Sequence, residues 1–510
     1  MVKSQKKKIK VIQLKKKPKT EKAKPVLKRY NIDISSNLKK KLTTSKNDGL
    51  NLYIKKLIKP ENSKSKEESV SWDFYELKNN IKKKISPKLY GWYLEDTSSA
   101  GTSTFDAIKA YKDFKFEPNY LNPNKNFSFE NSITLHSKDL GMNQYKIKCP
   151  FFTAPYGSAS SYGGQSNELS TMEGSIQGDG IYTCASFSTY SVEQMSSFIK
   201  KESKEPNPFY MYQLYLTGDN DINISLIERI KASDVPILIV TIDTGGNAHG
   251  GIGLLENQSD LTYSYNFTGN LRADPVFNIK CYEKYKCVGT KDKTVLAEVS
   301  KYLKIPISTV LSSYDLSKAF DYAKVVQGEG MGNLYMSNNA KDTLCLKNIV
   351  NIAHSKNSIS KYVNRNFKKG IPIVFKGCIS IPVALNIQKS GADGVYVSNH
   401  GGRFIYNSIP PLDILTDIKN AVKKNDSKFG VWFDGGIRYG SDIVTAYCRG
   451  AEFVGLGRPI IYACVLYGKE GVSATTKKFR FELETQCKIC GINNFSLKEQ
   501  MKGILFRENN

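Results

Sequence analysis

The sequence predicts an α/β fold, a (β/α)8 TIM barrel, on two observations. After residue 150, short apolar segments recur; each ends in glycine, serine, asparagine or a charged residue, and a longer stretch of mixed polarity follows. Strands that alternate with helical connections form parallel sheets. Eight strands are expected, the number that closes this barrel, and a doubly wound open sheet remains the alternative. The expected strands are 151–154, 181–184, 209–215, 237–242, 371–375, 394–397, 430–433 and 453–455.

A basic segment precedes this pattern. Residues 1–66 contain 22 lysines and arginines against 4 acidic residues, and so carry +18 of the net charge of +26 of the 510-residue chain. Lysine-rich segments with few large apolar residues remain solvated. Nucleic-acid binding is disfavoured because no aromatic interleaving or recognition motif accompanies the charge. We therefore expect a basic low-complexity tail over 1–66, followed by the barrel over 71–505.

The sequence shows neither a secretory signal nor a membrane span. No apolar core follows the first lysines, and no run approaches the ~20 apolar residues that a spanning helix needs. We expect no integral membrane association and a cytoplasmic location, with the mitochondrion as the alternative. The ten cysteines are scattered, which favours reduced thiols. Cys487 and Cys490 lack a second pair or a nearby histidine, so packed helix residues are favoured over a metal or redox site.

The polar turn after the sixth expected strand carries the strongest chemical signal. Residues 398–403 read Ser-Asn-His-Gly-Gly-Arg, which places His400 and Arg403 three residues apart at the end of a strand. An imidazole can take up a proton near neutral pH. A guanidinium can hold a carboxylate through two parallel hydrogen bonds. The pair suits proton abstraction from a small hydroxy acid; the alternative is a capping histidine beside a surface arginine.

Polar residues follow the other expected strands as well. In a (β/α)8 barrel the active site lies at the carboxyl ends of the strands, so these residues are expected to share one rim. They are Tyr156, Ser186, Gln213, Thr241, Asp243, Lys376, His400, Arg403, Asp434 and Arg458.

The connection between the fourth and fifth expected strands, about 245–370, is too long for one loop and helix. It contains a glycine-rich stretch at 244–252 and segments of helical pattern at 292–303 and 314–325. We expect an insertion over the mouth of the barrel, part lid and part helix, because long loops at active sites often act as lids.

Two glycine–arginine loops follow the last two strands. Residues 434–440 read Asp-Gly-Gly-Ile-Arg-Tyr-Gly, and residues 455–459 read Gly-Leu-Gly-Arg-Pro. The loops after strands seven and eight of such barrels often bind phosphate. Glycines let backbone N–H groups approach the phosphate oxygens, and arginines add positive charge. The two loops together indicate a phosphate-bearing cofactor.

These motifs resemble the FMN-dependent 2-hydroxy acid oxidase and dehydrogenase family, which includes glycolate oxidase, lactate oxidase, mandelate dehydrogenase and flavocytochrome lactate dehydrogenase. The resemblance rests on 398–403, on 434–442 and on Gly450-Ala451 followed by 457–459. Upstream it extends through Lys376-Gly377, 241–244, 213–215 and Ala154-Pro155, and it covers roughly 71–505. The motifs occur in the order that the family has.

The resemblance implies a catalytic set of five residues. His400 is the implied base, Arg403 the anchor of the substrate carboxylate, and Asp243 the support of the imidazole. Tyr215 is implied to contact the substrate. Lys376 is implied to lie by the N1–O2 edge of the flavin, where a cation stabilises negative charge on the reduced ring.

The resemblance also implies the residues that hold FMN. Gln213 and Thr241 are expected at the flavin ring, Asp434 at the ribityl chain, and Arg438 with Arg458 at the phosphate. The full expected set is Ala154, Pro155, Tyr156, Ser186, Gln213, Thr241, Lys376, Ser398, Asp434, Gly435, Gly436, Arg438, Gly457 and Arg458.

Three departures from the family concern substrate recognition. Trp92 aligns where relatives usually have a substrate-binding tyrosine. The loop 245–251 lacks the family's second arginine; His249 is there, either as a partial substitute or as a plain loop residue. Residues 185–187 read Ala-Ser-Phe where relatives have Ser-Ser-Trp. Losing one charged partner of a carboxylate costs about 1.5–3 kcal/mol of binding free energy.

The expected function is oxidation of a small (S)-2-hydroxy acid, lactate- or glycolate-like, to the 2-oxo acid through FMN. Residues 1–135 contain no histidine to ligate a haem, so oxygen or a separate acceptor is expected to take the electrons. The resemblance also implies a homo-oligomer, a tetramer. One alternative is a catalytically degenerate FMN-binding barrel with a structural or RNA-associated role; another is a different FMN barrel such as an isomerase.

Overall fold

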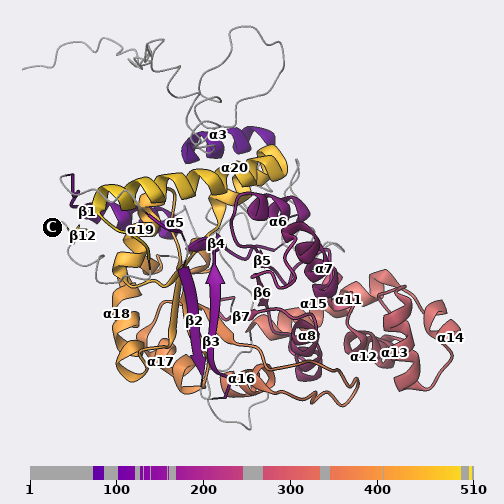
Figure 1. Cartoon of the computed structure of the whole chain (residues 1–510). Helices are drawn as coiled ribbons and strands as arrows, with labels where there is room; N and C mark the ends of the chain where they lie inside the picture. Colours follow the sequence, from indigo (N-terminus) through magenta and orange to yellow (C-terminus); the bar gives the residue numbers. More distant parts are fainter. Residues whose placement is uncertain are drawn as a thin grey trace, which may run out of the picture. The chain divides into compact units, whose positions relative to one another are not determined.

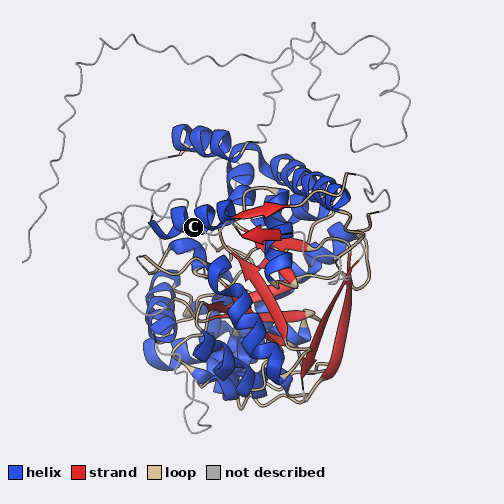
Figure 2. Ribbon diagram, turned by 90° about the vertical axis from the view of Figure 1, so that its left-hand side faces the viewer, coloured by secondary structure: helices blue, strands red, loops and turns tan. Residues whose placement is uncertain are grey.

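The computed structural model describes eleven stretches of the chain: 73–85, 102–120, 127–129, 131–137, 139–157, 159, 168–244, 268–332, 345–405, 407–495 and 505–507. Eight parallel strands form one sheet in the order β4-β11-β10-β9-β8-β7-β6-β5. A parallel bridge between Phe152 and Ile181 joins the two ends of this order. The sheet therefore closes into the predicted (β/α)8 barrel, which helices surround (Figures 1 and 2).

The eight strands lie where the sequence predicts them. They are β4 (Phe151–Thr153), β5 (Thr183–Cys184), β6 (Met211–Leu214), β7 (Ile237–Thr241), β8 (Ile373–Cys378), β9 (Gly394–Val397), β10 (Gly430–Asp434) and β11 (Phe453–Leu456). Strand β7 reads Ile-Leu-Ile-Val-Thr and every residue of it is buried. Such near-continuous apolar strands are expected where helices cover a parallel sheet. Strand β5 is shorter than predicted because Ile181 contributes only the isolated bridge.

Helices follow the strands around the barrel, with α17, α18 and α19 on one side and α6, α7 and α8 on the other (Figure 1). These helices are α6 (Glu168–Gln177), α7 (Val192–Ser203), α8 (Asn220–Ala232), α17 (Ile381–Lys389), α18 (Pro411–Asn425), α19 (Gly440–Arg449) and α20 (Arg458–Cys490). Helix α20 is kinked at Gly468. The entry helix α3 (Phe74–Lys84) packs on α20, with the rings of Phe74 and Tyr462 stacked 5.3 Å apart.

Several smaller elements complete the barrel. Helix α5 (Thr102–Lys109) continues into the 3-10 turn η3 (Ala110–Asp113), and β1 (Phe114–Phe116) pairs with β12 (Leu505–Arg507) near the other end of the chain. The antiparallel hairpin of β2 (Asn131–Ser137) and β3 (Gly141–Ile147) lies along the barrel (Figure 1).

The long connection between β7 and β8 carries six helices among the residues described. They are α11 (Gly269–Arg272), α12 (Pro275–Tyr285), α13 (Lys293–Leu303), α14 (Ile307–Ser312), α15 (Leu316–Gly332) and α16 (Leu346–His354). Helices α13 and α15 confirm the helical segments predicted there. Helices α12 to α14 extend beyond α8 (Figure 1) and bury a small core of their own that includes Ile279, Val299 and Val310. The glycine-rich part of the expected lid lies outside the described residues.

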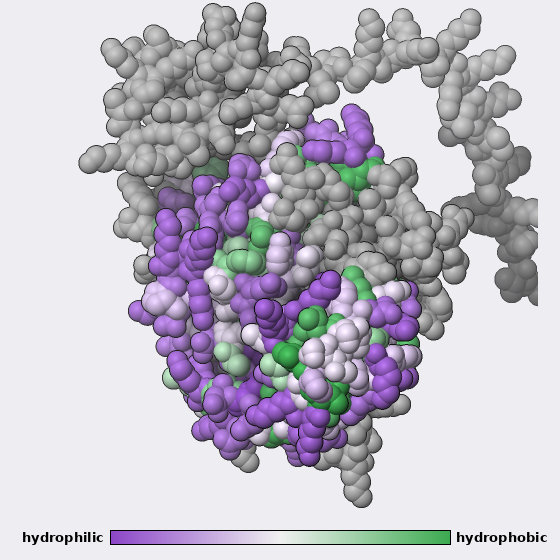
Figure 3. Space-filling model, turned by 90° about the vertical axis from the view of Figure 1, so that its right-hand side faces the viewer, coloured by the Kyte–Doolittle hydropathy of each residue, from purple (hydrophilic) through white to green (hydrophobic). Residues whose placement is uncertain are grey.

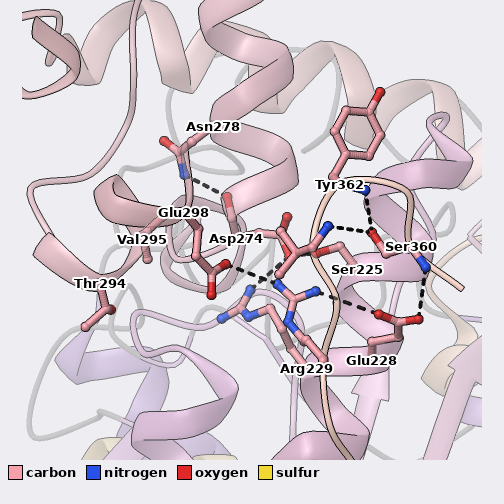
Figure 4. Close-up of polar contacts among 12 residues, drawn as sticks. Ser225, Glu228, Arg229, Asp274, Asn278, Thr294, Val295, Glu298, Ser360 and Tyr362 are labelled. Atoms are coloured by element: carbon pink, nitrogen blue, oxygen red, sulfur yellow. Dashed lines mark hydrogen bonds and ion pairs between the residues drawn. The ribbon is translucent and has the colours of Figure 1, made fainter. Parts of the chain in front are cut away.

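A buried charge network attaches this insertion to the barrel helix α8 (Figure 4). Arg229 donates to both oxygens of Glu193, at 2.8 and 2.7 Å, and lies 3.4 Å from Asp274, which is fully buried. Glu228 accepts hydrogen bonds from the backbone N–H groups of Ile359 and Ser360. A buried charge is tolerated only where it is paired, so the network fixes how α12 sits on α8.

The surface on the insertion side is largely hydrophilic, with apolar side chains gathered in places (Figure 3). Ile307 and Leu311 of α14 are among the exposed apolar residues. All ten cysteines are free, and Cys487 and Cys490 pack as buried residues of α20. Among the described helices, none combines the length and apolar character that crossing a membrane requires.

Candidate active site

The turn after β9 presents His400 in an unusual backbone conformation. His400, Gly401 and Gly402 all have positive φ, at 56°, 67° and 77°, and form the 3-10 turn η6 (His400–Gly402). The Asn399 side chain accepts the N–H of Gly402, and Thr104 of α5 donates to the carbonyl of Gly401 at 2.7 Å. A Cβ on Gly402 would lie 2.8 Å from the Thr104 nitrogen, so a glycine is required for this approach.

His400 is paired with a carboxylate from a neighbouring strand end. Its Nδ1 lies 2.7 Å from Oδ1 of Asp243, just after β7, and its Nε2 lies 3.4 Å from the hydroxyl of Tyr215, just after β6. The ionised carboxylate accepts the Nδ1–H, which leaves the lone pair on Nε2. The nitrogen that can act as a base therefore faces the Tyr215 side of the site.

The electrostatics of this pair suit a base that rests in its neutral form. Burial lowers the pKa of His400, and the cations of Lys376 and Arg403 lower it further against the opposing pull of Asp243. For Asp243, burial works to raise the pKa, but the interactions with His400 and Lys376 outweigh it and the pKa is lowered. The carboxylate therefore stays ionised and can stabilise an imidazolium once it forms.

A bulge in β8 brings the backbone of this strand against the carboxylate of Asp243. The pairing of β8 with β9 shifts register between Lys376 and Cys378, and the intervening Gly377 has φ of 105°. A Cβ on Gly377 would lie 2.3 Å from Cγ of Asp243, which no real contact allows. Only glycine therefore permits this approach of the β8 backbone to the carboxylate.

Lys376 lies at the centre of the site, only 4 % exposed. Its Nζ donates to Oγ of Ser398 at 3.1 Å and lies 4.0 Å from one carboxylate oxygen each of Asp243 and Asp434. Asp434 also accepts the Tyr396 hydroxyl at 2.8 Å. The two flanking carboxylates compensate the buried ammonium, so a cation is held where the ends of β8, β9 and β10 meet.

A hydrogen-bonded layer links the ends of β5, β6 and β7. Gln213 donates to the hydroxyl of Thr241 at 3.0 Å and accepts the backbone N–H of Ser186. Ser186 in turn donates to the Gln213 carbonyl and accepts the N–H of Tyr215 at 2.7 Å. The Tyr215 ring packs 4.9 Å from that of Phe187, and burial raises its pKa, so its hydroxyl stays protonated.

The two glycine–arginine loops bring two guanidinium groups near each other. Burial lowers the pKa of Arg438 to about 10, with the charge of Arg458 as the next cause. The Arg438 guanidinium lies 4.2 Å from the centre of the Phe74 ring, and Arg458 donates to the Gly401 carbonyl at 2.9 Å. A Cβ on Gly457 would meet no atom within 4 Å. An anion bound here would relieve the repulsion between the two guanidinium groups and could be approached closely by the backbone at Gly457.

Comparison with known proteins agrees with the geometry of the site. The model of a family described as FMN-dependent dehydrogenase matches residues 81–501. The chain belongs to this family. An L-lactate oxidase from Lentilactobacillus hilgardii is 27% identical over 350 residues, which cover 69% of this chain and 74% of that protein. An FMN-dependent alpha-hydroxy acid dehydrogenase from Schizosaccharomyces pombe is 28% identical over 305 residues, covering 58% of this chain and 61% of that protein.

Solved structures of the FMN-dependent dehydrogenase family share the fold. A structure of an oxidised active mutant of (S)-mandelate dehydrogenase superposes with a TM-score of 0.61 at 18% identity, covering 86% of this chain and 99% of that one. The predicted fold, the family and the dependence on FMN are thereby confirmed. The paired arginines and the open backbone at Gly457 fit a phosphate, and the buried ammonium of Lys376 fits the electron-rich edge of a flavin.

The structure brings most of the predicted site residues into contact. Direct hydrogen bonds or ion pairs connect His400, Asp243, Lys376, Ser398 and Asp434, and also Ser186, Gln213, Thr241 and Tyr215. Ala154 and Pro155 directly follow β4, and the Tyr156 hydroxyl bonds to Thr171 of α6 at 2.5 Å. Gly435 and Gly436 lie in the loop after β10 with positive φ. Trp92 and His249 lie outside the described residues.

Two residues that contribute to the site were not predicted from the sequence. Phe404 packs edge-to-face on the His400 ring, with centroids 4.5 Å apart, and Tyr396 holds Asp434. Tyr396 had a signal, because it lies two residues before Ser398 on one strand and so shares its face. Phe404 had none, since its position depends on the turn at 400–402.

Proposed function

We propose that the chain oxidises a small (S)-2-hydroxy acid, lactate- or glycolate-like, to the corresponding 2-oxo acid. One observation carries the proposal. The His400–Asp243 pair, 2.7 Å apart, lies beside the ammonium of Lys376, which is 4.0 Å from the other oxygen of Asp243. A neutral base, its ionised support and a fixed cation are what removal of a proton and a pair of electrons from a hydroxy acid requires.

In this proposal His400 takes up a proton at Nε2. A hydroxy acid loses two protons and two electrons in becoming a 2-oxo acid, so a base must accept at least one of the protons. Burial keeps the imidazole neutral beforehand. Asp243 then stabilises the imidazolium through the hydrogen bond at Nδ1. FMN, when bound, supplies the group that accepts the two electrons.

Arg403 and Tyr215 position the substrate. Arg403 directly follows η6, three residues after the base, and its charge is felt by His400. Its guanidinium holds the substrate carboxylate through two parallel hydrogen bonds, which fixes the hydroxyl-bearing carbon near the imidazole. The hydroxyl of Tyr215, which is protonated and lies 3.4 Å from Nε2, donates a further hydrogen bond to the substrate.

The remaining predicted residues hold the cofactor. Arg438 and Arg458 bind the phosphate, and Asp434 binds the ribityl chain. Lys376 compensates negative charge on the flavin. The ring edge and the backbone contacts fall to Ala154, Pro155, Tyr156, Ser186, Gln213, Thr241, Ser398, Gly435, Gly436 and Gly457. By family resemblance, the proposal also includes oxygen or a separate acceptor as the group that takes the electrons from the flavin. It further includes assembly of the chain into a homo-tetramer.

Anaerobic stopped-flow reduction of the bound flavin by a panel of 2-hydroxy acids tests the proposal. His400→Gln is expected to retain FMN and to slow reduction by about 10²–10⁴-fold, the usual contribution of a positioned base. His136→Gln on β2 is the matched control, because His136 lies only 3.8 Å from surface Asp426 and far from this chemistry in the fold. A yellow protein that no hydroxy acid bleaches is instead a catalytically degenerate FMN-binding barrel.

A further inference from the structure

A second cavity lies at the opposite end of the barrel from the active site. It has a volume of about 1020 Å³ and is bordered by strand β3 and by the residues that enter β6, β7 and β8. Phe209 and Tyr210 precede β6, Pro236 precedes β7 and Ile371 precedes β8. The site residues follow these same strands, so the strands separate the cavity from the FMN site. The hairpin of β2 and β3 forms its outer wall, and we name it the basal groove.

The basal groove carries an excess of positive charge. Its lining contains six lysines and two acidic residues: Lys146, Lys148, Lys200, Lys231, Lys368, Lys369, Glu205 and Asp234. Lys148 pairs with Glu205, and Lys200 lies 3.6 Å from Asp234. Lys231 is buried and donates to the carbonyls of Ile352 and Ser355, at 2.8 and 3.2 Å. The acidic residues are thus both engaged within the groove.

Three lysines remain uncompensated. Within the described parts of the chain, Lys146, Lys368 and Lys369 form no ion pair, and all three are exposed. Like charges that face one concavity repel each other, and the low-dielectric walls concentrate their field. An anion would therefore gain more binding free energy in the basal groove than on a convex surface with the same charges.

The cations and the volume of the basal groove together suit an anion with several charges. The lining contains lysines and no arginine. A guanidinium fork binds carboxylates and phosphates in a fixed plane, whereas each ammonium is a point charge that can contact phosphate oxygens from any direction. The volume suits a ligand with several phosphate groups, because small-molecule sites measure about 300–1,000 Å³.

We propose that the basal groove binds a small oligophosphate anion, one per chain. The three uncompensated lysines hold the phosphates. Beside them, the rings of Tyr145 and Phe209 lie 5.2 Å apart, and the Tyr145 hydroxyl is fixed on the Pro236 carbonyl at 3.0 Å. This aromatic wall could take the base of a nucleoside triphosphate, while inorganic triphosphate would use the lysines alone; the shared chemistry is the chain of phosphates.

Isothermal titration calorimetry tests the proposal on the full chain saturated with FMN, so that the cofactor phosphate site is occupied. Inorganic triphosphate and ATP are titrated separately at constant ionic strength. Lys368→Gln combined with Lys369→Gln is expected to weaken triphosphate binding at least tenfold, because two charged contacts are lost. Lys301→Gln on α13 combined with Lys304→Gln at the C-cap of that helix removes the same charge outside the groove and is expected to leave the affinity unchanged. Tighter binding of ATP than of triphosphate would assign the aromatic wall to a base.

Hydrogen exchange gives an independent location for the ligand. Triphosphate is expected to slow amide exchange in peptides covering β3 and residues 368–371, and Lys146→Gln should weaken binding as well. Equal weakening by the two double variants, several equivalents bound per chain, or no heat of binding at millimolar triphosphate would each overturn the proposal. Protection confined to the active-site loops would overturn it too. FMN content, measured by absorbance, is expected to be unchanged in every variant.

Discussion

Replacing Gly377 by alanine should disable the base without touching it. Gly377 has φ of 105°, and a Cβ there would lie 2.3 Å from Cγ and 2.5 Å from Oδ2 of Asp243. Carbon atoms in contact are about 3.5–4.0 Å apart, so the carboxylate must move by more than 1 Å. The hydrogen bond of 2.7 Å that orients His400 cannot survive such a shift.

The expected magnitude has two parts. Backbone strain at this φ should lower the free energy of unfolding by about 1–3 kcal/mol. Loss of the oriented carboxylate should slow flavin reduction by about 10²–10⁴-fold, the range expected when a catalytic histidine loses its supporting aspartate or its function as a base. The strain lowers stability, whereas only the displaced Asp243 lowers the rate.

Gly141→Ala separates the two parts. Gly141 also has positive φ, 70°, but a Cβ there would meet no atom within 4 Å, and it lies in the hairpin away from the site. This variant should lose comparable stability and keep the wild-type rate. Thermal unfolding and anaerobic stopped-flow reduction of both variants provide the measurement. If Gly377→Ala reduces its flavin as fast as wild type, the close approach of β8 to Asp243 is not what supports the base.

Three further predictions concern charge. Because burial and then Lys376 lower the pKa of His400, the base is already neutral at pH 7; reduction rates should be flat above that pH and fall only below the ordinary imidazole pKa of ~6.5. Burial opposes protonation of His354, but Asp393 at 2.8 Å outweighs burial and raises the pKa of His354. The stability that this pair contributes is fully present below pH ~6.5 and is lost as the pH rises through the raised pKa. His354→Gln should therefore flatten the pH dependence of thermal unfolding in that range. Arg229→Met should cost about 3–5 kcal/mol in urea unfolding, because Asp274 is left buried without its partner.

Each of these has an outcome that would contradict it. An acid limb of the rate profile centred above pH 7 would mean that His400 is not held neutral. A wild-type pH dependence in His354→Gln would show that the pair contributes nothing in that range. For Arg229, the control is Lys318→Met, since Lys318 forms an exposed pair with Asp315 and should change stability by less than 1 kcal/mol; equal losses in both variants would contradict the argument from burial.

The barrel could be predicted because its signals are local. Each buried strand is a short apolar run whose end is marked by a polar residue or glycine, as in β9 followed by Ser398. The gathering of the candidate site residues at one rim could be predicted as well, because parallel strands deliver their carboxyl ends to one rim. Neither inference required knowledge of which distant segments touch.

What failed to be predicted depends on geometry that spacing does not encode. The bulge at Gly377 brings the β8 backbone against Asp243, and nothing in a Lys-Gly-Cys sequence distinguishes a bulge from a regular strand. The pairing of β1 with β12 joins residues about 390 positions apart, for which a local pattern has no signal. The basal groove escaped for the same reason, since its lysines come from several separate segments.

The contact of α5 with the catalytic turn ties the site to the order of synthesis. Thr104 and the Gly401 carbonyl that it binds are separated by 297 residues of chain. At about 5–20 residues per second, the ribosome needs about 15–60 s to produce the partner after α5 has emerged. During that interval α5 cannot occupy its final position, and the turn that presents His400 cannot be braced. Catalytic competence should therefore arise as a late step of folding. A chain released before β9 is made would contain the strands β4 to β8 but would lack His400, the proposed catalytic base.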